Sequence, residues 1–425
     1  MKIILVHNYY GSSAPSGENK VFEAEKAMLE KQGHEVEVYT RHSDEIRSEP
    51  RNTLNTRKCG IMGNSKFRTF RVFCGFKKVW GLLKGALCTI GNPFAAMVVA
   101  KKCREFKPNV VHFHNTFPLI SPLAVWAASK YAPVVMTLHN YRTACAAGVP
   151  TRDGKVCSLC LDKKCVWDGV RYRCYRGSLL TTLPLAINIA LYRKRLTKWV
   201  TRFIVLSDFQ KRKMVEYGWL EHIITVKGNF VDGRVVSGGV EIKKNQIVYV
   251  GRLSKEKGVE TLIKAFKILS ESSVYSEVKN LKLIIVGDGV DRQELEKLAE
   301  GLNVEFVGQK LAHEVRRIMG ESKVSVLPSE WWETFGLTVI ESMKAGTPVV
   351  TSDLGALPEI VQDGCFGEVF EAGNAEACAA SIERLLERKD YDEMCAEARR
   401  VAKMMYSEEA NYEQLMKIYE SVKYA

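Results

Sequence analysis

Short apolar runs typical of buried strands alternate with stretches of helical periodicity along most of this 425-residue chain. Such alternation is typical of parallel sheets whose strands are joined by helices. One hydrophobic core stops growing well below this length, so we expect two domains. The sequence therefore predicts an α/β fold of two Rossmann-like, doubly wound domains that face one another across a deep cleft. Ligands of such folds bind outside the carboxyl ends of the strands.

The expected strands form two sets. The first set lies at Lys2–His7, Glu35–Thr40, Val110–His114, Val134–His139 and Phe203–Ser207. The second set lies at Ile247–Val250, Leu281–Val286, Val304–Val307, Val324–Leu327 and Pro348–Thr351. A polar stretch without periodicity separates the two sets. We expect an N-terminal domain over residues 1–228, a linker over 229–245, a C-terminal domain over 246–405 and a final helix over 406–425. Packing of that helix back on the first domain is one interpretation.

Two carboxylates flank the start of one expected helix. Glu333 and Glu341 are separated by seven residues, and a turn between them leads from a strand into a helix. The backbone amides of Phe335, Gly336 and Leu337 at that helix start, together with the helix dipole, favour an anion such as a diphosphate. Each carboxylate can accept hydrogen bonds from a sugar or a ribose on either side of the diphosphate. The pattern predicts a sugar-nucleotide site, with solvated helix-end charges as the alternative.

Two cations, Arg252 and Lys257, lie in the loop between the first strand of the second set and the helix that follows it. A guanidinium group and an ammonium group beside a helix start can neutralise a diphosphate leaving group. The chain has no clear Asp-x-Asp motif for a divalent metal. We therefore expect that catalysis needs no cofactor, because fixed cations stabilise the charge instead. Ordinary surface cations are the alternative interpretation.

Two glycine-containing loops follow expected strands. Gly287 belongs to a Gly-Asp-Gly sequence that lacks the third glycine of a dinucleotide fingerprint, which counts against a dehydrogenase. Gly17 belongs to the loop from Gly11 to Glu18, and its backbone N–H can close on a ligand. A simple surface loop is the alternative for this second segment.

Besides His7, three histidines lie on expected strands of the first set. His139 ends its strand, where its side chain reaches the edge of the sheet, and we favour a polar contact with a sugar or an acceptor over a buried structural role. His112 and His114 lie two positions apart on one strand and share a face. A third metal ligand is not evident for them, so we favour packing for both.

The formal net charge of +13 is concentrated in the N-terminal half. Two basic stretches, Arg57–Lys107 and Arg171–Lys213, fit an anionic membrane face, a phosphorylated acceptor or nucleic acid. The segment Val79–Ala100 predicts an amphipathic surface helix or a plain core helix, because Lys84 and Asn92-Pro93 interrupt it. The opening run is too short for a signal-peptide core. We expect a cytoplasmic protein in peripheral contact with the inner face of the cell membrane.

Five of the twelve cysteines lie between residues 145 and 174. Cys157 and Cys160 have the spacing of metal ligands, and Cys145 and Cys174 flank them. Four thiolates at short-loop spacing are typical of a structural zinc site. Reduced thiols and a disulfide pair are the alternatives to this predicted zinc.

In combination, these motifs resemble the family 4 glycosyltransferases, the retaining enzymes of the GT-B fold, and in particular a bacterial type acting on surface polysaccharides. The matching segments are Tyr10–Glu18, Val110–Asn115, Thr137–Asn140, Asn229–Asp232, Gly251–Gly258, Val286–Gly289, Pro328–Glu341, Ala345–Val350 and Gly355–Glu359. The resemblance implies that Arg252 and Lys257 bind the donor diphosphate and that Glu341 binds the ribose. It further implies that Glu333 holds the donor sugar, with His139 at the sugar and acceptor and Gly17 in the N-terminal glycine loop.

This resemblance implies transfer of a sugar from a nucleoside diphosphate-sugar to a hydroxyl of a glycan or lipid-linked acceptor, with retention at the anomeric carbon. The chain departs from the family at Ser16, Thr334 and Gly228, where members usually have glycine, glycine and proline, so the sugar preference cannot be carried over. A basic zinc-containing nucleic-acid-binding protein is the alternative. Because the sequence shows no groove-reading helix and no RNA-binding motif, we expect no nucleic acid partner. A phosphorylase of the same fold is a third interpretation, although no pyridoxal-phosphate lysine motif is apparent.

Overall fold

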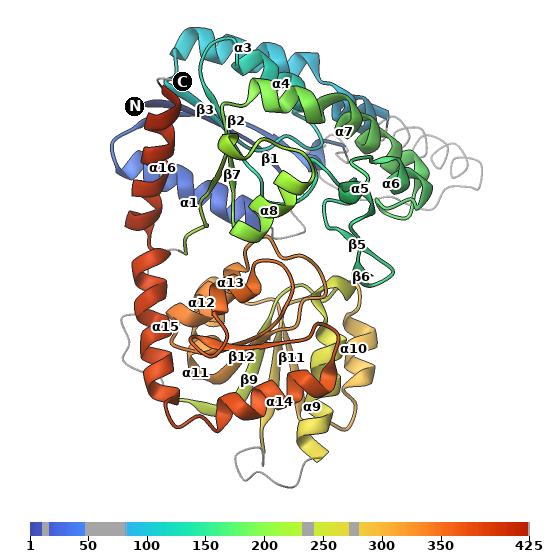
Figure 1. Cartoon of the computed structure of the whole chain (residues 1–425), viewed down its shortest axis with the longest axis vertical. Helices are drawn as coiled ribbons and strands as arrows, with labels where there is room; N and C mark the ends of the chain where they lie inside the picture. Colours follow the sequence, from blue (N-terminus) through green and yellow to red (C-terminus); the bar gives the residue numbers. More distant parts are fainter. Residues whose placement is uncertain (11–16, 47–80, 82, 232–241, 272–279, 424–425) are drawn as a thin grey trace, which may run out of the picture. The chain divides into compact units, whose positions relative to one another are not determined.

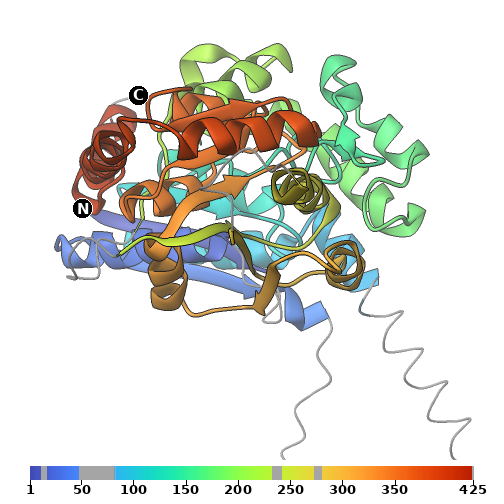
Figure 2. The same ribbon diagram turned by 90° about the horizontal axis from the view of Figure 1, so that it is seen from below.

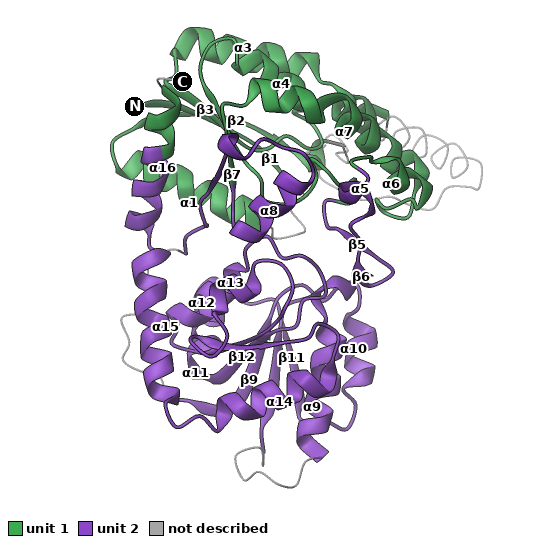
Figure 3. Cartoon of the chain, in the orientation of Figure 1, with its two compact units in different colours: residues 1–147, 164–204, 418–425 green, residues 148–163, 205–417 purple. Residues whose placement is uncertain are grey.

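The computed structural model describes residues 1–10, 17–46, 81, 83–231, 242–271 and 280–423 (Figure 1). Residues 11–16 of the predicted glycine loop, residues 57–80 and 82 of the first basic stretch, and most of the predicted linker, 232–241, lie outside the described residues. The chain divides into two compact units (Figure 3). The first comprises residues 1–147, 164–204 and 418–425, and the second comprises residues 148–163 and 205–417.

One six-stranded sheet has the order β2-β1-β3-β4-β7-β8; its strands from β2 through to β7 organise the first unit, whereas β8 lies in residues of the second unit. The strands of this sheet are β1 (Lys2–Tyr9), β2 (Glu35–His42), β3 (Val110–Asn115), β4 (Val134–Thr137), β7 (Arg202–Val205) and β8 (Ile224–Val226). The pairs from β2 through to β7 are parallel. Every residue of β3 and β4 is buried, as expected for central strands covered on both faces.

The helices of the first unit connect and cover these strands. They are α1 (Gly17–Lys31), η1 (Ser43–Ile46), α3 (Pro93–Phe106), α4 (Pro122–Ala128), α6 (Trp167–Arg171) and α7 (Leu179–Trp199), and the last helix, α16 (Glu408–Lys423), ends in this unit. Asn92 begins α3, because its side chain accepts a hydrogen bond from the N–H of Ala95, and Pro93 occupies the first turn, where no N–H is needed. Helix α1 contributes Val21, Phe22, Glu25, Met28 and Leu29 to the buried interior.

The second unit contains a parallel sheet with the order β11-β10-β9-β12-β13-β14. Its strands are β9 (Lys244–Val250), β10 (Lys282–Val286), β11 (Val304–Gly308), β12 (Ser322–Leu327), β13 (Val349–Ser352) and β14 (Gly367–Phe370). The strand order reverses direction between β9 and β12, which is the switch point of a doubly wound sheet. Loops that follow these two strands therefore meet at one place.

Helices cover both faces of this second sheet. They are η3 (Lys255–Lys257), α9 (Val259–Glu271), α10 (Arg292–Leu298), α11 (Ala312–Glu321), α12 (Leu337–Lys344), α13 (Leu357–Val361), α14 (Ala375–Leu386) and α15 (Tyr391–Met405). Ile247 and Tyr249 of β9 pack in a cluster with α9 and α14, which lie on the same side of the sheet (Figure 2). Val248 packs on the opposite face against Ile318 and Met319 of α11. Alternate residues of β9 thus pack into the hydrophobic cores on the two faces of the sheet.

Smaller elements occupy residues for which no strand or helix was predicted. They are the antiparallel pair β5 (Thr151–Arg152) and β6 (Lys155–Val156), with α5 (Leu159–Asp162), α8 (Asp208–Glu216) and η2 (Glu221–Ile223). Among the described residues, no single helix is long and apolar enough to cross a bilayer. The helix pair Leu83–Ile90 and Pro93–Phe106, bent by 52°, passes that test by length and composition only when the two helices are taken together.

The predicted fold class is confirmed, since two parallel six-stranded α/β sheets are present and all ten predicted strands occur. Two edge strands, β8 and β14, were not predicted from the sequence. The fourth predicted strand was extended too far, because β4 ends at Thr137 and His139 lies beyond it. Strand β9 begins at Lys244, inside the predicted linker.

Candidate active site

The loops that follow β9, β10 and β12 lie in backbone contact at the switch point of the second sheet. A Cβ on Gly287, at φ +134°, would lie 1.8 Å from the carbonyl oxygen of Gly251. A Cβ on Gly258, at φ +65°, would lie 1.8 Å from the carbonyl oxygen of Pro328. The N–H of Glu330 also donates to the carbonyl of Glu256 at 2.9 Å. Only glycine permits both approaches, and they bring the predicted cation loop against the predicted carboxylate turn.

A buried ion pair joins these two loops. The Lys257 ammonium lies 2.5 Å from Oε1 of Glu333, and their side chains are only 18% and 8% exposed. The Ser329 hydroxyl donates to the same oxygen at 2.8 Å. The ammonium also lies 5.2 Å from the ring centroid of Trp331, within range of a cation–π contact. Each charge is therefore held at a fixed position by more than one contact.

Tyr249 of β9 lies beside this pair. Burial raises the pKa of its hydroxyl, and the nearby charges of Glu333 and Glu256 raise that pKa further. The hydroxyl stays protonated and donates to the carbonyl of Arg252 at 2.7 Å. This bond fixes the backbone of Arg252, while its guanidinium is 62% exposed and lies 3.4 Å from Glu256. Arg252 thus presents an exposed cation from an anchored backbone.

Helix α12 begins within the predicted turn. Gly336 precedes its first residue at φ +92°, and no side chain caps the helix start. Phe335 is buried, and a Cβ on Gly228 would lie 2.8 Å from its ring. That contact leaves little room for a side chain at residue 228, where the resemblance predicts proline. Glu341, in the second turn of α12, is partly buried.

The structure therefore places most of the predicted donor-site residues on neighbouring loops of one unit. Those residues are Arg252, Lys257, Gly287, Glu333, Phe335, Gly336 and Leu337. Sequence reasoning missed Ser329 and Trp331, which contact the ion pair. The sequence signal was available, because both lie within the Pro328–Glu341 motif.

His139 and Gly17 belong to the first unit. His139 follows β4, is 9% exposed, and its Nε2 lies 3.1 Å from Nδ1 of His114. Burial lowers the pKa of His139 well below its usual value, and the neighbouring histidines add to that lowering. A cavity of about 60 Å³ is lined by His139, His114, Asn140 and Arg142, among others, and is large enough for a few water molecules.

Gly17 begins α1 and is exposed. The next residue, Glu18, accepts a hydrogen bond from the side-chain amide of Asn140 at 2.5 Å. Burial raises the pKa of Glu18, although the Asn140 bond and the Arg142 charge oppose this rise. The start of α1 is thereby tied to the residue that follows His139, a contact that spacing alone does not reveal.

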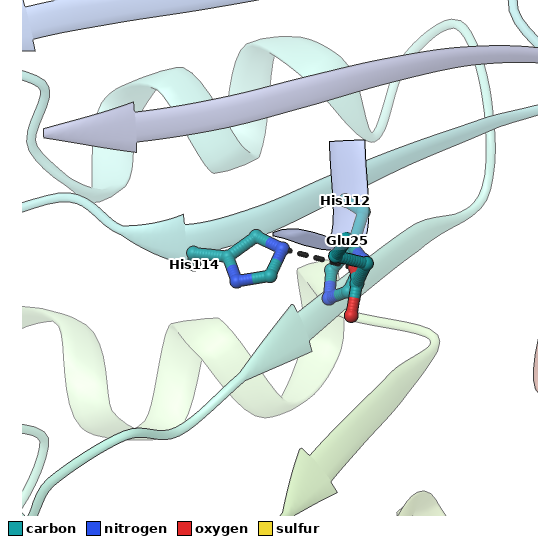
Figure 4. A group of neighbouring side chains, drawn as sticks. All are labelled: Glu25, His112 and His114. Atoms are coloured by element: carbon teal, nitrogen blue, oxygen red, sulfur yellow. Dashed lines mark hydrogen bonds and ion pairs between the residues drawn. The ribbon is translucent and has the colours of Figure 1, made fainter. Parts of the chain in front are cut away.

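His112 and His114 are packed in the interior, as predicted, and the structure places beside them a third candidate ligand that was not evident from the sequence. Glu25 of α1 places one carboxylate oxygen 3.0 Å from Nδ1 of His112 and 3.1 Å from Nε2 of His114 (Figure 4). These three ligand atoms could hold a metal ion, since all lie within 4.8 Å of one another. The helical spacing of α1 shows that Glu25 faces inward, yet it does not show which strand residue meets it.

The predicted zinc ligands are divided between the two units. Cys145 and Cys174 belong to the first unit, and Cys157 and Cys160 belong to the second, beside or within α5. Cys145 and Cys160 are buried, whereas Cys157 and Cys174 are partly exposed. The zinc site stays a prediction.

Two family models match almost the whole chain. "Glycosyltransferase Family 4" matches residues 17–233, and "Glycosyl transferases group 1" matches residues 237–402. The first of these covers half of the chain, so the chain belongs to glycosyltransferase family 4. This membership confirms the predicted family and places the chain among the glycosyltransferases.

Individual relatives agree with this assignment. The chain is 33% identical over 320 residues to an uncharacterised 41.2 kDa protein in the cps region of Klebsiella pneumoniae, covering 71% of this chain and 76% of that protein. It is 26% identical over 305 residues to the sulfoquinovosyl transferase SQD2 of Arabidopsis thaliana, covering 71% of this chain but only 54% of SQD2. The crystal structure of Anabaena Alr3699/HepE in complex with UDP superposes with a TM-score of 0.63 at 16% identity, covering 99% of this chain and all of that chain. This likeness supports the GT-B fold.

Proposed function

We propose that this protein is a retaining glycosyltransferase that moves a sugar from a nucleoside diphosphate-sugar to a hydroxyl group. The observation that carries the proposal is the buried Lys257–Glu333 pair between the loops after β9 and β12, directly before the start of α12. A structural neighbour of the same fold binds UDP, which supports a nucleoside diphosphate as the leaving group.

The donor diphosphate would bind between the cations and the helix start. Arg252, with its exposed guanidinium, and Lys257 would neutralise the charge that develops on the departing diphosphate. The amides of Phe335, Gly336 and Leu337 would add hydrogen bonds and the positive end of the α12 dipole. Gly287 keeps the loop after β10 close to these groups. A ligand contact of the Gly17 amide, at the start of α1, is a separate proposal.

Two carboxylates would bind the sugar and ribose hydroxyls. Glu333 is held by Lys257 and Ser329, so it is positioned to accept hydrogen bonds from a sugar. Glu341 would accept from the ribose. The leaving diphosphate itself would then help to deprotonate the acceptor hydroxyl, which is consistent with retention. His139 would contact the sugar or the acceptor as a neutral imidazole, because burial lowers its pKa.

We further propose a lipid-linked glycan as the acceptor, in surface polysaccharide synthesis, with the protein in peripheral contact with an anionic membrane. The Klebsiella relative from the cps region supports the pathway. Exposed apolar side chains support the membrane contact: Leu87 is 67% exposed, and Phe94 and Met97 of α3 are 72% and 58% exposed. Lys84 and Lys101 lie on the same two helices and suit anionic headgroups.

A thermal-shift screen of nucleoside diphosphate-sugars tests the donor proposal. We expect one or more donors to raise the Tm of the wild-type protein, and we expect Lys257→Ala and Glu341→Ala to abolish that rise. Lys255→Ala is the matched control, because Lys255 is an exposed cation two positions away. A rise that survives in both site variants would place the donor elsewhere, and the absence of a rise with every donor would count against the activity.

A further inference from the structure

A chain of hydrogen bonds runs from the interior of the first unit to His139. One oxygen of Glu25 lies 3.1 Å from Nε2 of His114, and Nδ1 of His114 lies 3.1 Å from Nε2 of His139. Glu25 and His114 are 2% and 3% exposed. The His114 and His139 rings stack at a centroid separation of 5.3 Å, so this contact restricts the orientation of both rings. Figure 4 shows the first link, from α1 to β3.

The charge on Glu25 sets the direction of the whole chain. Two imidazole nitrogens lie within 3.1 Å of the same carboxylate oxygen, and an ionised carboxylate can only accept hydrogen bonds. His114 must then carry its proton on Nε2, and its Nδ1 becomes an acceptor. His139 in turn must donate from Nε2, which leaves Nδ1 as its unprotonated nitrogen.

His112 also contacts the Glu25 carboxylate. Its Nε2 lies 2.8 Å from the hydroxyl of Thr137, and its Nδ1 lies 2.7 Å from the hydroxyl of Tyr419 on α16. Every ring nitrogen of His112 and His114 thus has a protein partner. Glu25 is hydrogen-bonded to His114 and lies 3.0 Å from Nδ1 of His112, and the three ligand atoms converge at this place.

We propose that Glu25 and His114 form a buried relay that holds His139 in the tautomer protonated on Nε2, so that Nδ1 accepts a hydrogen bond from a sugar or acceptor hydroxyl. Both are positioning residues, since they act through His139. The proposal rests on the role given to His139 in the proposed function. A His139 in the other tautomer would be a donor at Nδ1 and would offer the hydroxyl no acceptor.

The test uses two substitutions at His114 that differ in one property. Asn places its amide oxygen near the position of Nδ1, so His114→Asn keeps an acceptor for His139, whereas His114→Leu removes it. Protein labelled with ¹⁵N-histidine reports the tautomer of each ring, and His139→Gln identifies the His139 signals. We expect an unprotonated Nδ1 on His139 in the wild type and in His114→Asn, and a mixture of tautomers in His114→Leu.

Turnover with the donor found in the thermal screen gives the second readout. We expect His114→Leu to lower kcat roughly 10- to 100-fold, the range seen when the partner that orients a functional histidine is removed. His114→Asn should restore most of it, and Glu25→Gln should lower kcat with a loss of the single tautomer. If the role of His114 were purely structural, the ¹⁵N signals of His139 would keep their wild-type tautomer in both variants, and the Asn and Leu substitutions would lower kcat equally.

Three results would overturn the relay: a proton on Nδ1 of wild-type His139, one equivalent of metal bound to purified protein and lost in Glu25→Gln, or full kcat in His114→Leu. The ¹⁵N readout needs no substrate. A failed donor screen with the expected tautomer would therefore contradict the proposed function and leave the Glu25–His114–His139 relay standing.

Discussion

At the residue scale, the Lys257–Glu333 pair shows how a charged site is held inside a sheet protein. Both side chains are largely buried, so each charge depends on the other for compensation. A substitution that removes one charge of the pair leaves the other charge buried without its partner, whereas substitutions that remove both charges leave no unpaired charge. This asymmetry gives a stability prediction that does not depend on any substrate.

Lys257→Met should lower the free energy of unfolding by about 2 kcal/mol, the magnitude typical of a lost hydrogen bond to a charged group. The double variant Lys257→Met with Glu333→Gln should recover part of that loss. Urea unfolding of the wild type, both single variants and the double variant gives the coupling energy. Strictly additive effects would show that the two side chains do not interact in solution.

Gly287 is constrained by its backbone as well as by its neighbours. Its φ of +134° lies outside the range of other residues, and a Cβ would lie 1.8 Å from the carbonyl oxygen of Gly251. Gly287→Ala should therefore displace the loop after β9, lowering stability by about 1–3 kcal/mol and abolishing donor binding.

Gly301→Ala is the control for this change. Gly301 also has a positive φ, +81°, but a Cβ added there would have no neighbouring atom within 4 Å. We expect a loss of about 1 kcal/mol from the backbone alone, with donor binding retained. Chemical unfolding and the thermal screen measure both effects. Equal losses of stability in Gly287→Ala and Gly301→Ala would contradict the close approach of the Gly251 and Gly287 loops.

At the element scale, central strands are more predictable from sequence than edges and helix breaks. The strands from β9 to β13 each contain several apolar residues, and each was predicted to within three residues at its start. Strand β14, Gly367–Phe370, was not predicted because its apolar run has only two residues, Val369 and Phe370. Its strand conformation depends on parallel pairing with β13, and that pairing cannot be predicted from the local sequence.

The helix pair Leu83–Ile90 and α3 carries the prediction for membrane contact. Replacing both Leu87 and Phe94 with Glu should remove apolar area from the membrane contact and add repulsion between the new carboxylates and anionic lipid. Binding to vesicles with phosphatidylserine should therefore fall at least tenfold, since each buried CH₂ lost costs on the order of 0.8 kcal/mol. Vesicle flotation at low and high salt measures this. Leu311→Glu, at an exposed position beside α11, is the control and should bind as the wild type does. Equal binding by all three proteins would contradict the proposed membrane face.

The C-terminal helix contributes to the interior of the first unit through Tyr419, which is fully buried. Its hydroxyl contacts His112 at 2.7 Å, so Tyr419→Phe should lower the free energy of unfolding by about 1 kcal/mol. Val422→Ala, in the same helix turn and also buried, tests packing without the hydrogen bond. Stability unchanged in Tyr419→Phe, measured by urea unfolding, would contradict the contact.

At the scale of the whole molecule, buried neutral histidines make stability depend on pH. Burial lowers the pKa of His7 from 6.5 to about 3, outweighing its bond with Asn19. Between these values the unfolded chain binds the proton and the folded chain does not. Stability should therefore be greatest above pH 6.5 and should fall as the pH drops below it, by up to about 1.4 kcal/mol per pH unit for this group.

His7→Gln should reduce the loss of stability between pH 7.5 and 5.5 by about 1 kcal/mol relative to the wild type. Urea unfolding at the two pH values measures the difference. His313→Gln, at an exposed position on α11, should show the wild-type loss. An unchanged loss in His7→Gln would show that His7 titrates alike in both states.

How far the site could be predicted from the sequence differs between the two units. In the second unit the residues of Arg252–Lys257 and Glu333–Glu341 lie in short motifs directly after strands, so their proximity follows from the strand order. In the first unit, Glu25 meets His114 across 89 residues of sequence. That contact depends on how α1 packs on β3, which periodicity does not specify. The close contact between Gly228 and the Phe335 ring is likewise seen only in the structure.

Hydrogen–deuterium exchange with and without a bound nucleoside diphosphate tests the central claim most directly. The donor-site account predicts slower exchange in peptides that cover residues 251–258, 287–289 and 333–341. The same peptides should show no change in Lys257→Ala, and they should keep the effect in Lys255→Ala. Slower exchange confined to other segments, or no change with any nucleoside diphosphate, would contradict a donor site at the switch point between β9 and β12.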